Sequence, residues 1–117
     1  AAKGGLRGAL FANVGYGVST VLTGRPGFGY DGNRNTSFSS FQALRGNLLI
    51  LNMQTAATGE GGDCFGDSGS PKFLGSDRRI VVGVVSWGDA TCRATSVNYR
   101  VDTEAARAFL GQFVALP

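Results

Sequence analysis

The sequence of 117 residues contains no histidine and only two lysines, Lys3 and Lys72. A serine that attacks a carbonyl carbon needs a neighbouring base to remove its proton, and histidine is the side chain that most often does so. The chain therefore has no histidine base of its own. Chemistry of this kind would need a base from another chain segment or from a lysine.

Long apolar runs and clustered charges are also absent. The longest apolar run, residues 48–53, is far too short to span a bilayer. Eleven basic and eight acidic residues give a net charge of +3 and are spread along the chain, whereas a nucleic-acid site would need a basic cluster. We therefore expect neither a nucleic-acid nor a membrane partner. Residues 1–5 have no apolar core of the secretory-signal type, so we expect that a signal has been removed or that the chain begins inside a longer one.

What the sequence has in abundance is glycine. Nineteen glycines and 43% hydrophobic residues favour an all-β fold with many tight turns. The length allows one domain with a sizeable core.

The most informative stretch is residues 62–71, which read Gly-Asp-Cys-Phe-Gly-Asp-Ser-Gly-Ser-Pro. It places a small nucleophile, Ser68, between Asp67 and Gly69. Glycines allow backbone N–H groups to converge because they have no Cβ, and converging N–H groups can hold an oxyanion. A turn without chemistry would use similar residues, and composition alone leaves that alternative open.

The run from Gly66 to Pro71 resembles the nucleophile loop of trypsin- and chymotrypsin-like serine proteases, whose usual form is Gly-Asp-Ser-Gly-Gly-Pro. Only Ser70 departs from that form. In this family one β-barrel supplies a histidine and an aspartate, and a second supplies the serine, the oxyanion hole and the specificity pocket. The chain resembles the second barrel of a bacterial-type secreted member, loosely up to about Ala43 and tightly from Asn52 onward. Residues 14–17, Val-Gly-Tyr-Gly, are similar to the family's Gly-Trp-Gly strand end.

The resemblance implies a single six-stranded antiparallel Greek-key β-barrel over residues 10–117, with a C-terminal α-helix and a linker-like lead-in over residues 1–9. Apolar and β-branched runs predict strands at residues 10–19, 41–44, 48–53, 72–74, 80–86 and 96–102. The continuous run at residues 48–53 predicts a strand buried on both faces. Residues 23–40 are rich in Gly, Asn, Asp and Ser and predict a loop.

Apolar residues at helical spacing predict a helix over residues 103–113, with Asp102 or Thr103 as its N-cap. Cys64 and Cys92 are the only cysteines and lie 28 positions apart. The resemblance implies that they form a disulfide, because the family joins the residue four before the nucleophile to one just past a Ser-Trp-Gly strand. Two free buried thiols are the alternative. A disulfide implies a secreted or periplasmic protein.

The resemblance also implies the site. Ser68 would be the nucleophile, the backbone N–H groups of Gly66 and Ser68 would form the oxyanion hole, and Asp67 would be a buried acidic support. A peptide substrate would pair as an added strand with residues 86–88. The implied substrate-binding residues are Gly62, Asp63, Phe65, Ser86, Trp87, Gly88 and Ser96. The resemblance implies no metal and no cofactor.

Two of these residues carry more specific expectations. In the family, the counterpart of Asp67 pairs with a freed N-terminal amine or with an arginine. The start Ala1-Ala2-Lys3 does not match the amine-donating form, and a lone buried carboxylate is costly. We therefore expect Asp67 to be exposed in a loosened loop or paired with an arginine.

An aspartate two residues before the cysteine selects Lys or Arg in trypsin-type enzymes. Gly62 holds that place here and Asp63 follows it, so a gap of one residue would restore the match. Ser96 adds bulk where relatives often have glycine, and Asn98 replaces a tyrosine usual nearby. We expect a preference for basic side chains through Asp63.

These features predict the C-terminal half of a secreted trypsin-like serine endopeptidase that acts on peptides or proteins. It would be inactive alone and would need the N-terminal barrel for its histidine and aspartate. The alternatives are a non-catalytic peptide-binding barrel and a barrel that forms a homodimer through its uncovered interdomain face. A Ser68–Lys72 dyad would be another route to activity, although Lys72 lies at the head of an expected strand.

Overall fold

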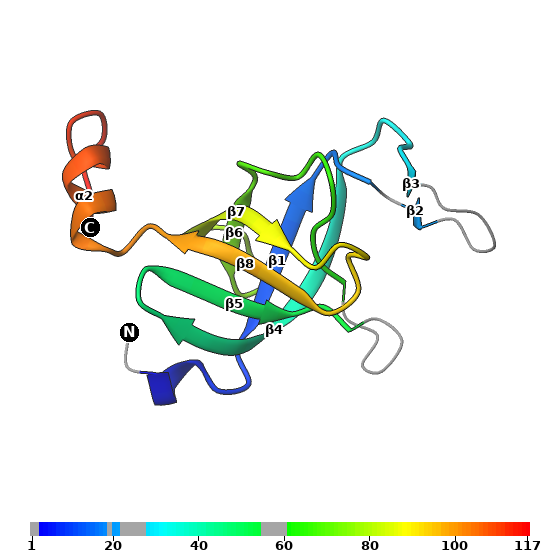
Figure 1. The fold of residues 1–117 in the computed structure, drawn as a ribbon. Coiled ribbons are helices and arrows are strands. Elements are labelled where there is room, and N and C mark those ends of the chain that lie inside the picture. Colours follow the sequence, from blue (N-terminus) through cyan, green and yellow to red (C-terminus); the bar gives the residue numbers. More distant parts are fainter. Residues whose placement is uncertain (1–2, 19, 22–27, 55–60) are drawn as a thin grey trace.

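A computed structural model of the chain shows a closed antiparallel barrel of six strands (Figure 1). It describes residues 3–18, 20–21, 28–54 and 61–117. The barrel strands follow one another in the spatial order β1-β4-β5-β8-β7-β6. Their bounds are β1 Leu10–Gly15, β4 Asn35–Arg45, β5 Leu48–Asn52, β6 Pro71–Leu74, β7 Val81–Gly88 and β8 Thr95–Arg100.

The connection from β5 to β6 gives the barrel its topology. The strand β6 does not pair with β5 but returns beside β1, where Asn13 pairs with Lys72. A fourth strand that returns beside the first is the arrangement of a Greek key. The predicted fold class is therefore confirmed.

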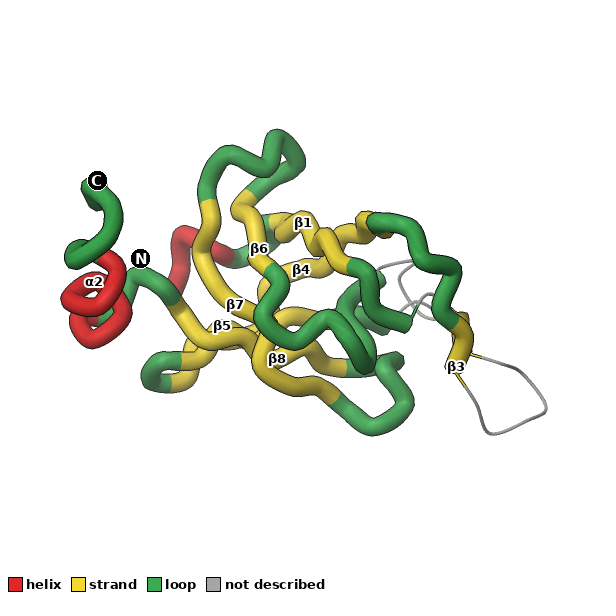
Figure 2. Tube along the Cα trace, turned by 90° about the horizontal axis from the view of Figure 1, so that it is seen from above, coloured by secondary structure: helices red, strands yellow, loops and turns green. Residues whose placement is uncertain are grey.

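Three smaller elements lie outside the barrel. A 3-10 helix, η1 (Lys3–Leu6), precedes β1, and β2 (Thr20–Val21) pairs with β3 (Phe28–Gly29) in a separate two-stranded sheet. The helix α2 (Glu104–Leu110) follows β8. Figure 2, viewed from above, shows α2 and the β3 strand at opposite ends of the barrel.

Several predicted boundaries were wrong. The first strand, predicted over residues 10–19, ends at Gly15, and β4 begins at Asn35 inside the loop predicted over residues 23–40. Residues 19 and 23–27 of these two predictions lie outside the described residues. Pairing explains the long β4: every residue of β1 has a partner between Asn35 and Ser40. Cross-strand pairing overrides the polar composition of residues 35–40, which by itself favours a turn.

The strand β5 is not buried on both faces, as its apolar run had predicted. Leu49 and Leu51 are buried, and the residues between and beside them are half-buried. Ile80 and Val81, in the run that predicted a core strand, are 55% and 44% exposed. An apolar run in this barrel therefore marks a strand without specifying which of its faces is covered.

The predicted helix is present but shorter, and it packs differently from a core helix. Thr103 is its N-cap, because its Oγ1 accepts a hydrogen bond of 3.2 Å from the N–H of Ala106. None of its residues is buried. Phe109 and Phe113 pack on each other at a ring-centroid distance of 5.3 Å but are 61% and 70% exposed. The apolar face of α2 is thus uncovered by the described part of the chain, and Figure 1 shows the helix set apart from the barrel.

The barrel interior has two differently filled ends. We define the apolar end as the buried residues Phe11, Leu44, Leu49 and Leu51 with the side chains packed on them. We define the polar end as Asn13, Ser37, Ser39, Asp63, Lys72, Ser96 and Asn98, which form one hydrogen-bonded group.

Strand periodicity explains the change from one end to the other. Side chains two positions apart on a strand face the same way, so Phe11 and Asn13 on β1 share a face, as do Leu74 and Lys72 on β6. Both strands change from apolar to polar in the same direction, because Asn13 pairs with Lys72. The polar end lies toward the loop that carries Ser68, since Asp63 belongs to that loop.

Candidate active site

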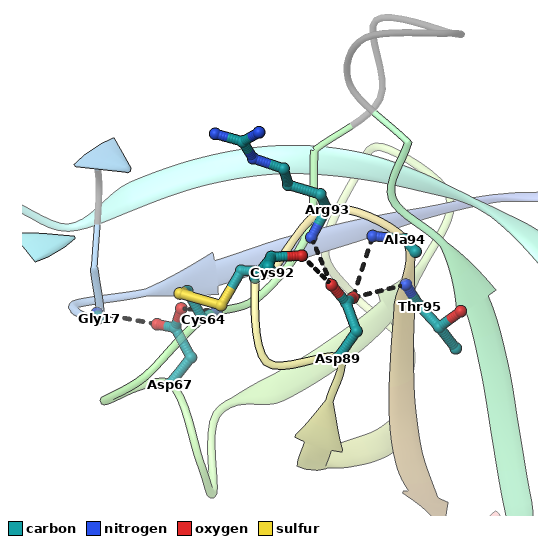
Figure 3. The surroundings of a disulfide bond; sticks show 9 residues. Gly17, Cys64, Asp67, Asp89, Cys92, Arg93, Ala94 and Thr95 are labelled. Carbon is teal, nitrogen blue, oxygen red and sulfur yellow. Dashed lines mark hydrogen bonds between the residues drawn. A yellow bond between two sulfur atoms is a disulfide. The ribbon is translucent and has the colours of Figure 1, made fainter. Parts of the chain in front are cut away.

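The disulfide predicted between Cys64 and Cys92 is confirmed, with a Cα–Cα distance of 5.3 Å. It ties the loop before Ser68 to the connection between β7 and β8 (Figure 3). Closing a loop of this length contributes roughly 3–4 kcal/mol by restricting the unfolded chain. The disulfide therefore holds together the two segments that the sequence assigned to the substrate pocket.

The loop that carries Ser68 is anchored to the end of β7. The N–H of Gly69 donates to the carbonyl of Val85, and the N–H of Val85 donates to the carbonyl of Ser70, both at 2.9 Å. Ser68 itself is exposed. Its hydroxyl is therefore presented to solvent from a loop whose backbone is fixed on the C-terminal side.

Two backbone donors beside Ser68 are open. Within the described part of the chain, neither the N–H of Gly66 nor the N–H of Ser68 donates to an acceptor. Gly66 has φ of 92° and Gly69 has φ of 87°, a region that residues with a Cβ rarely adopt. The glycines thus permit a turn that leaves both N–H groups unused. An oxyanion hole is formed by open N–H donors of this kind near a nucleophile.

Asp67 is not exposed, so that predicted alternative was wrong, and no arginine among the described residues pairs with it. Its side chain is buried, at 8% exposure. One carboxylate oxygen accepts the N–H of Gly17 at 2.8 Å and the other accepts the N–H of Cys64 at 3.0 Å. Backbone N–H groups thus replace the cation that we expected. Figure 3 shows Asp67 beside the disulfide, reaching toward Gly17.

The glycines of the strand end after β1 make room for this carboxylate. A Cβ added at Gly15 would overlap the carboxylate of Asp67, and one at Gly17 would clash with the same group. The similarity of residues 14–17 to the family's Gly-x-Gly strand end thus has a steric basis. Phe65 is tied to the same region, because its carbonyl accepts the N–H of Val18 at 2.8 Å.

The end of β7 has one open edge. Trp87 and Gly88 pair with Val97 and Ser96 of β8, while β6 begins only at Pro71, opposite Val84. Among the described strands, residues 86–88 therefore have a neighbour on one side only. Trp87 is 56% exposed. An edge with unpaired backbone groups can accept an extended peptide as an added strand.

The predicted pocket residues are brought together. The hydroxyl of Ser96 donates to Asp63, and Ser96 pairs with Gly88 across the strands. Gly62 packs against Met53 so closely that a Cβ there would overlap its sulfur. The structure thus brings four of the predicted residues together beside the polar end: Gly62, Asp63, Gly88 and Ser96.

We did not predict that Lys72 would reach Asp63. Its side chain is fully buried, forms an ion pair with Asp63 and donates a hydrogen bond to Asn13. Burial lowers the pKa of Lys72 from its ordinary value, while the carboxylates of Asp63 and Asp67 act in the opposite direction. The ammonium has no hydrogen bond to Ser68 in the described part of the chain, so the structure does not form the Ser68–Lys72 dyad that the sequence left as a less favoured route.

The rest of the polar end satisfies its own hydrogen-bonding groups. The amide of Asn13 donates to Ser39 at 2.8 Å and to Ser37 at 3.0 Å. On the other side, the amide of Asn98 donates to Ser96 at 3.1 Å and to the carbonyl of Leu49 at 3.2 Å. No buried side-chain nitrogen or oxygen among the described residues lacks a partner. The alternation of Phe11 with Asn13 and of Lys72 with Leu74 was the sequence signal for this network.

Asp89 shapes the turn between β7 and β8. Its carboxylate accepts the N–H groups of Arg93, Ala94 and Thr95 at 2.9–3.0 Å (Figure 3). Burial would raise the pKa of Asp89, but these N–H groups outweigh it and hold that pKa well below its ordinary value. The turn presents Cys92 with φ of 55°. An aspartate just after a strand is a usual start for such a turn, and we missed it.

The described residues hold no cluster of three or more metal-ligating side chains. They also include no helix of the length and hydropathy needed to cross a membrane.

The Greek-key barrel carries an exposed serine, two open N–H donors at Gly66 and Ser68, and an open strand edge. Together these features define a fold of the serine-protease class. A comparison with protein-family models matches residues 33–109 to the trypsin family. The match covers more than half of the chain, and the chain belongs to that family. A comparison with curated proteins gave no match. The disulfide and the trypsin domain are consistent with an extracellular protein.

Proposed function

We propose that this chain is the C-terminal half of a secreted trypsin-like serine endopeptidase and supplies its nucleophile, Ser68. The observation that carries the proposal is the exposed Ser68 on an anchored loop, with its own N–H group and that of Gly66 open. The base is the part that is lacking, because the sequence has no histidine and Lys72 is held by Asp63 and Asn13.

The chemistry divides between two partners. A histidine of a companion barrel takes the proton of the Ser68 hydroxyl, and the Oγ of Ser68 attacks the carbonyl carbon of the peptide. The charge on the carbonyl oxygen is held by the N–H groups of Gly66 and Ser68, each worth roughly 2.7–4 kcal/mol in a transition state. The substrate backbone pairs with residues 86–88, where β7 has an open edge. Asp67 fixes the loop by accepting hydrogen bonds from the N–H groups of Gly17 and Cys64.

The companion barrel is the partner that this proposal requires. The uncovered apolar surface of α2 and the turn after it supports this partner, since Phe109 and Phe113 are more than half exposed. Aromatic side chains gathered on one exposed face mark an interaction surface. Without the companion, the chain is inactive.

Hydrolysis of a labelled casein tests the proposal. The chain alone is expected to show no hydrolysis, and the chain together with its histidine-bearing barrel is expected to show hydrolysis that Ser68→Ala abolishes. Activity of the chain alone that Ser68→Ala abolishes would refute the division between two barrels. Activity that survives Ser68→Ala would refute Ser68 as the nucleophile.

A non-catalytic peptide-binding barrel is the second candidate, and the open edge at residues 86–88 favours it, because that edge needs no base to bind a strand. Peptide binding at this edge, measured by shifts of backbone resonances, together with no activity in the presence of the companion barrel, would select this candidate. A homodimer through the uncovered face remains a third proposal, which sedimentation at high protein concentration tests.

A further inference from the structure

Both carboxylate oxygens of Asp63 already have a partner within the barrel. One oxygen pairs with the ammonium of Lys72, and the other accepts the hydroxyl of Ser96. The side chain of Asp63 is only 10% exposed, and that of Lys72 is fully buried. Both partners come from the barrel itself, so the carboxylate is satisfied before any substrate arrives.

The position of this pair matters because it lies beside the open edge of β7. Ser96, which holds Asp63, pairs with Gly88 at the end of that edge. The disulfide next to Asp63 joins the same two segments. A substrate side chain that entered between residues 62–64 and 86–88 would therefore come close to the Asp63–Lys72 pair.

The pair has no net charge. A cationic side chain gains from a buried carboxylate when that carboxylate is free, because opposite charges attract strongly away from water. Here the cation is already present, and a second one would be placed near the ammonium of Lys72. Displacing Lys72 is not open to the substrate, because its ammonium would remain buried without a counter-ion.

We propose that Lys72 determines specificity by occupying Asp63, so that the pocket takes an uncharged substrate side chain and not Lys or Arg. This inference rests on the proposed function, and it replaces the basic preference that Asp63 alone suggested. Lys72 acts through Asp63 and is a positioning residue, not a catalytic one.

Two small probes of the same shape test the inference without any catalysis. Benzamidine is a flat cation, and benzamide is its neutral counterpart. Binding of each to the 117-residue chain is followed by backbone NMR shifts at Gly88 and Ser96, which give both the site and the affinity. The wild-type chain is expected to bind benzamide at least as tightly as benzamidine.

Lys72→Met is expected to reverse this order, because it frees Asp63. Benzamidine should then bind about tenfold or more tightly than benzamide, as expected for a new hydrogen bond between charged groups. Adding Asp63→Asn to Lys72→Met should remove the gain. Lys3→Met is the matched control, since it removes the same charge from η1, outside the barrel, and should leave the order unchanged. Lys72→Leu serves as a second variant, and circular dichroism checks that each variant is folded.

The wild-type result decides even if neither Lys72 variant folds. Tenfold tighter binding of benzamidine than benzamide by the wild-type chain would overturn the inference, because Asp63 would be available despite Lys72. Binding of neither probe to the wild-type chain and a folded variant would also overturn it, because no pocket would open onto the pair. Either result leaves the assignment of Ser68 intact, since that assignment depends on hydrolysis.

Discussion

The two ends of the barrel interior share strands β1, β4 and β6 but are filled in opposite ways. At the apolar end, Phe11 and Leu51 are at most 1% exposed and pack among other apolar side chains. At the polar end, Lys72 and Asn98 are equally buried but are held by hydrogen bonds and an ion pair.

The apolar end contributes mainly to the stability of the barrel, whereas the polar end lies beside the candidate active site. Burial of apolar surface is the main favourable term in folding, and the apolar end supplies it. A buried ion pair is weak evidence for stability, because apolar residues of similar size are often as stable or more so. The polar end lies against the loop of Ser68 and the edge of β7.

The largest expected effect comes from breaking the ion pair. Asp63→Asn leaves the Lys72 ammonium buried without its counter-ion, and we expect a loss of about 3–5 kcal/mol in the free energy of unfolding, measured with urea. Adding Lys72→Met should restore most of the loss, because both charges are then gone. A loss below about 1 kcal/mol for Asp63→Asn would show that the pair is not sealed from water.

The apolar end should respond to lost volume. Leu51 is fully buried, so Leu51→Ala is expected to cost about 2–5 kcal/mol in thermal or urea unfolding. Leu51→Met is the control, since a swap that keeps the volume usually costs less than about 1.5 kcal/mol. Unlike Asp63→Asn, this loss should not be recovered by a second substitution at the polar end. Similar costs for Leu51→Ala and Leu51→Met would argue that volume is not what this end requires.

The support of the serine loop is tested at Gly15. A Cβ there would overlap the carboxylate of Asp67, so Gly15→Ala should destabilise the chain by about 1–3 kcal/mol through overpacking. Gly5→Ala is the control, because nothing lies within 4 Å of the position its Cβ would take. Faster hydrogen exchange in residues 64–70 of the Gly15 variant should accompany the loss. Equal stability of the two variants would contradict the placement of Asp67.

The smallest effect concerns Asp89 at the turn beside the polar end. Its pKa is lowered in the folded state, so its contribution to stability is present above its unfolded pKa and is lost as the pH falls through the folded one. Asp89→Asn should therefore cost about 1 kcal/mol at neutral pH. The difference from wild type should shrink as the pH falls below about 4. A difference that does not change with pH would show that the carboxylate charge is not what holds the turn.

The resemblance carried by short local motifs implied the barrel and the disulfide, but not the partners inside the barrel. The cysteine spacing and the run from Gly66 to Pro71 are short-range features that a sequence displays directly. Asp67 accepts a hydrogen bond from Gly17, which lies 50 positions away, and Lys72 donates one to Asn13, which lies 59 positions away. Such pairs depend on how β1 and β6 are aligned, and that alignment comes from the closed barrel.

The same limit explains the errors in the elements. Residues 35–40 are polar and were predicted as a loop, but β1 gives them a pairing partner along its whole length. The spacing in α2 predicted an amphipathic helix correctly, yet it could not reveal that the described part of the chain leaves the apolar face of that helix uncovered.

Chemical labelling of Ser68 is the most direct test of the central claim, that this serine is a nucleophile whose base comes from another segment. Diisopropyl fluorophosphate is added to the 117-residue chain alone and to the chain joined by its histidine-bearing barrel, and modified residues are located by mass spectrometry. We predict stoichiometric modification of Ser68 in the joined protein and little in the chain alone. Rapid modification of the isolated chain, or modification of another serine in preference to Ser68, would contradict the claim.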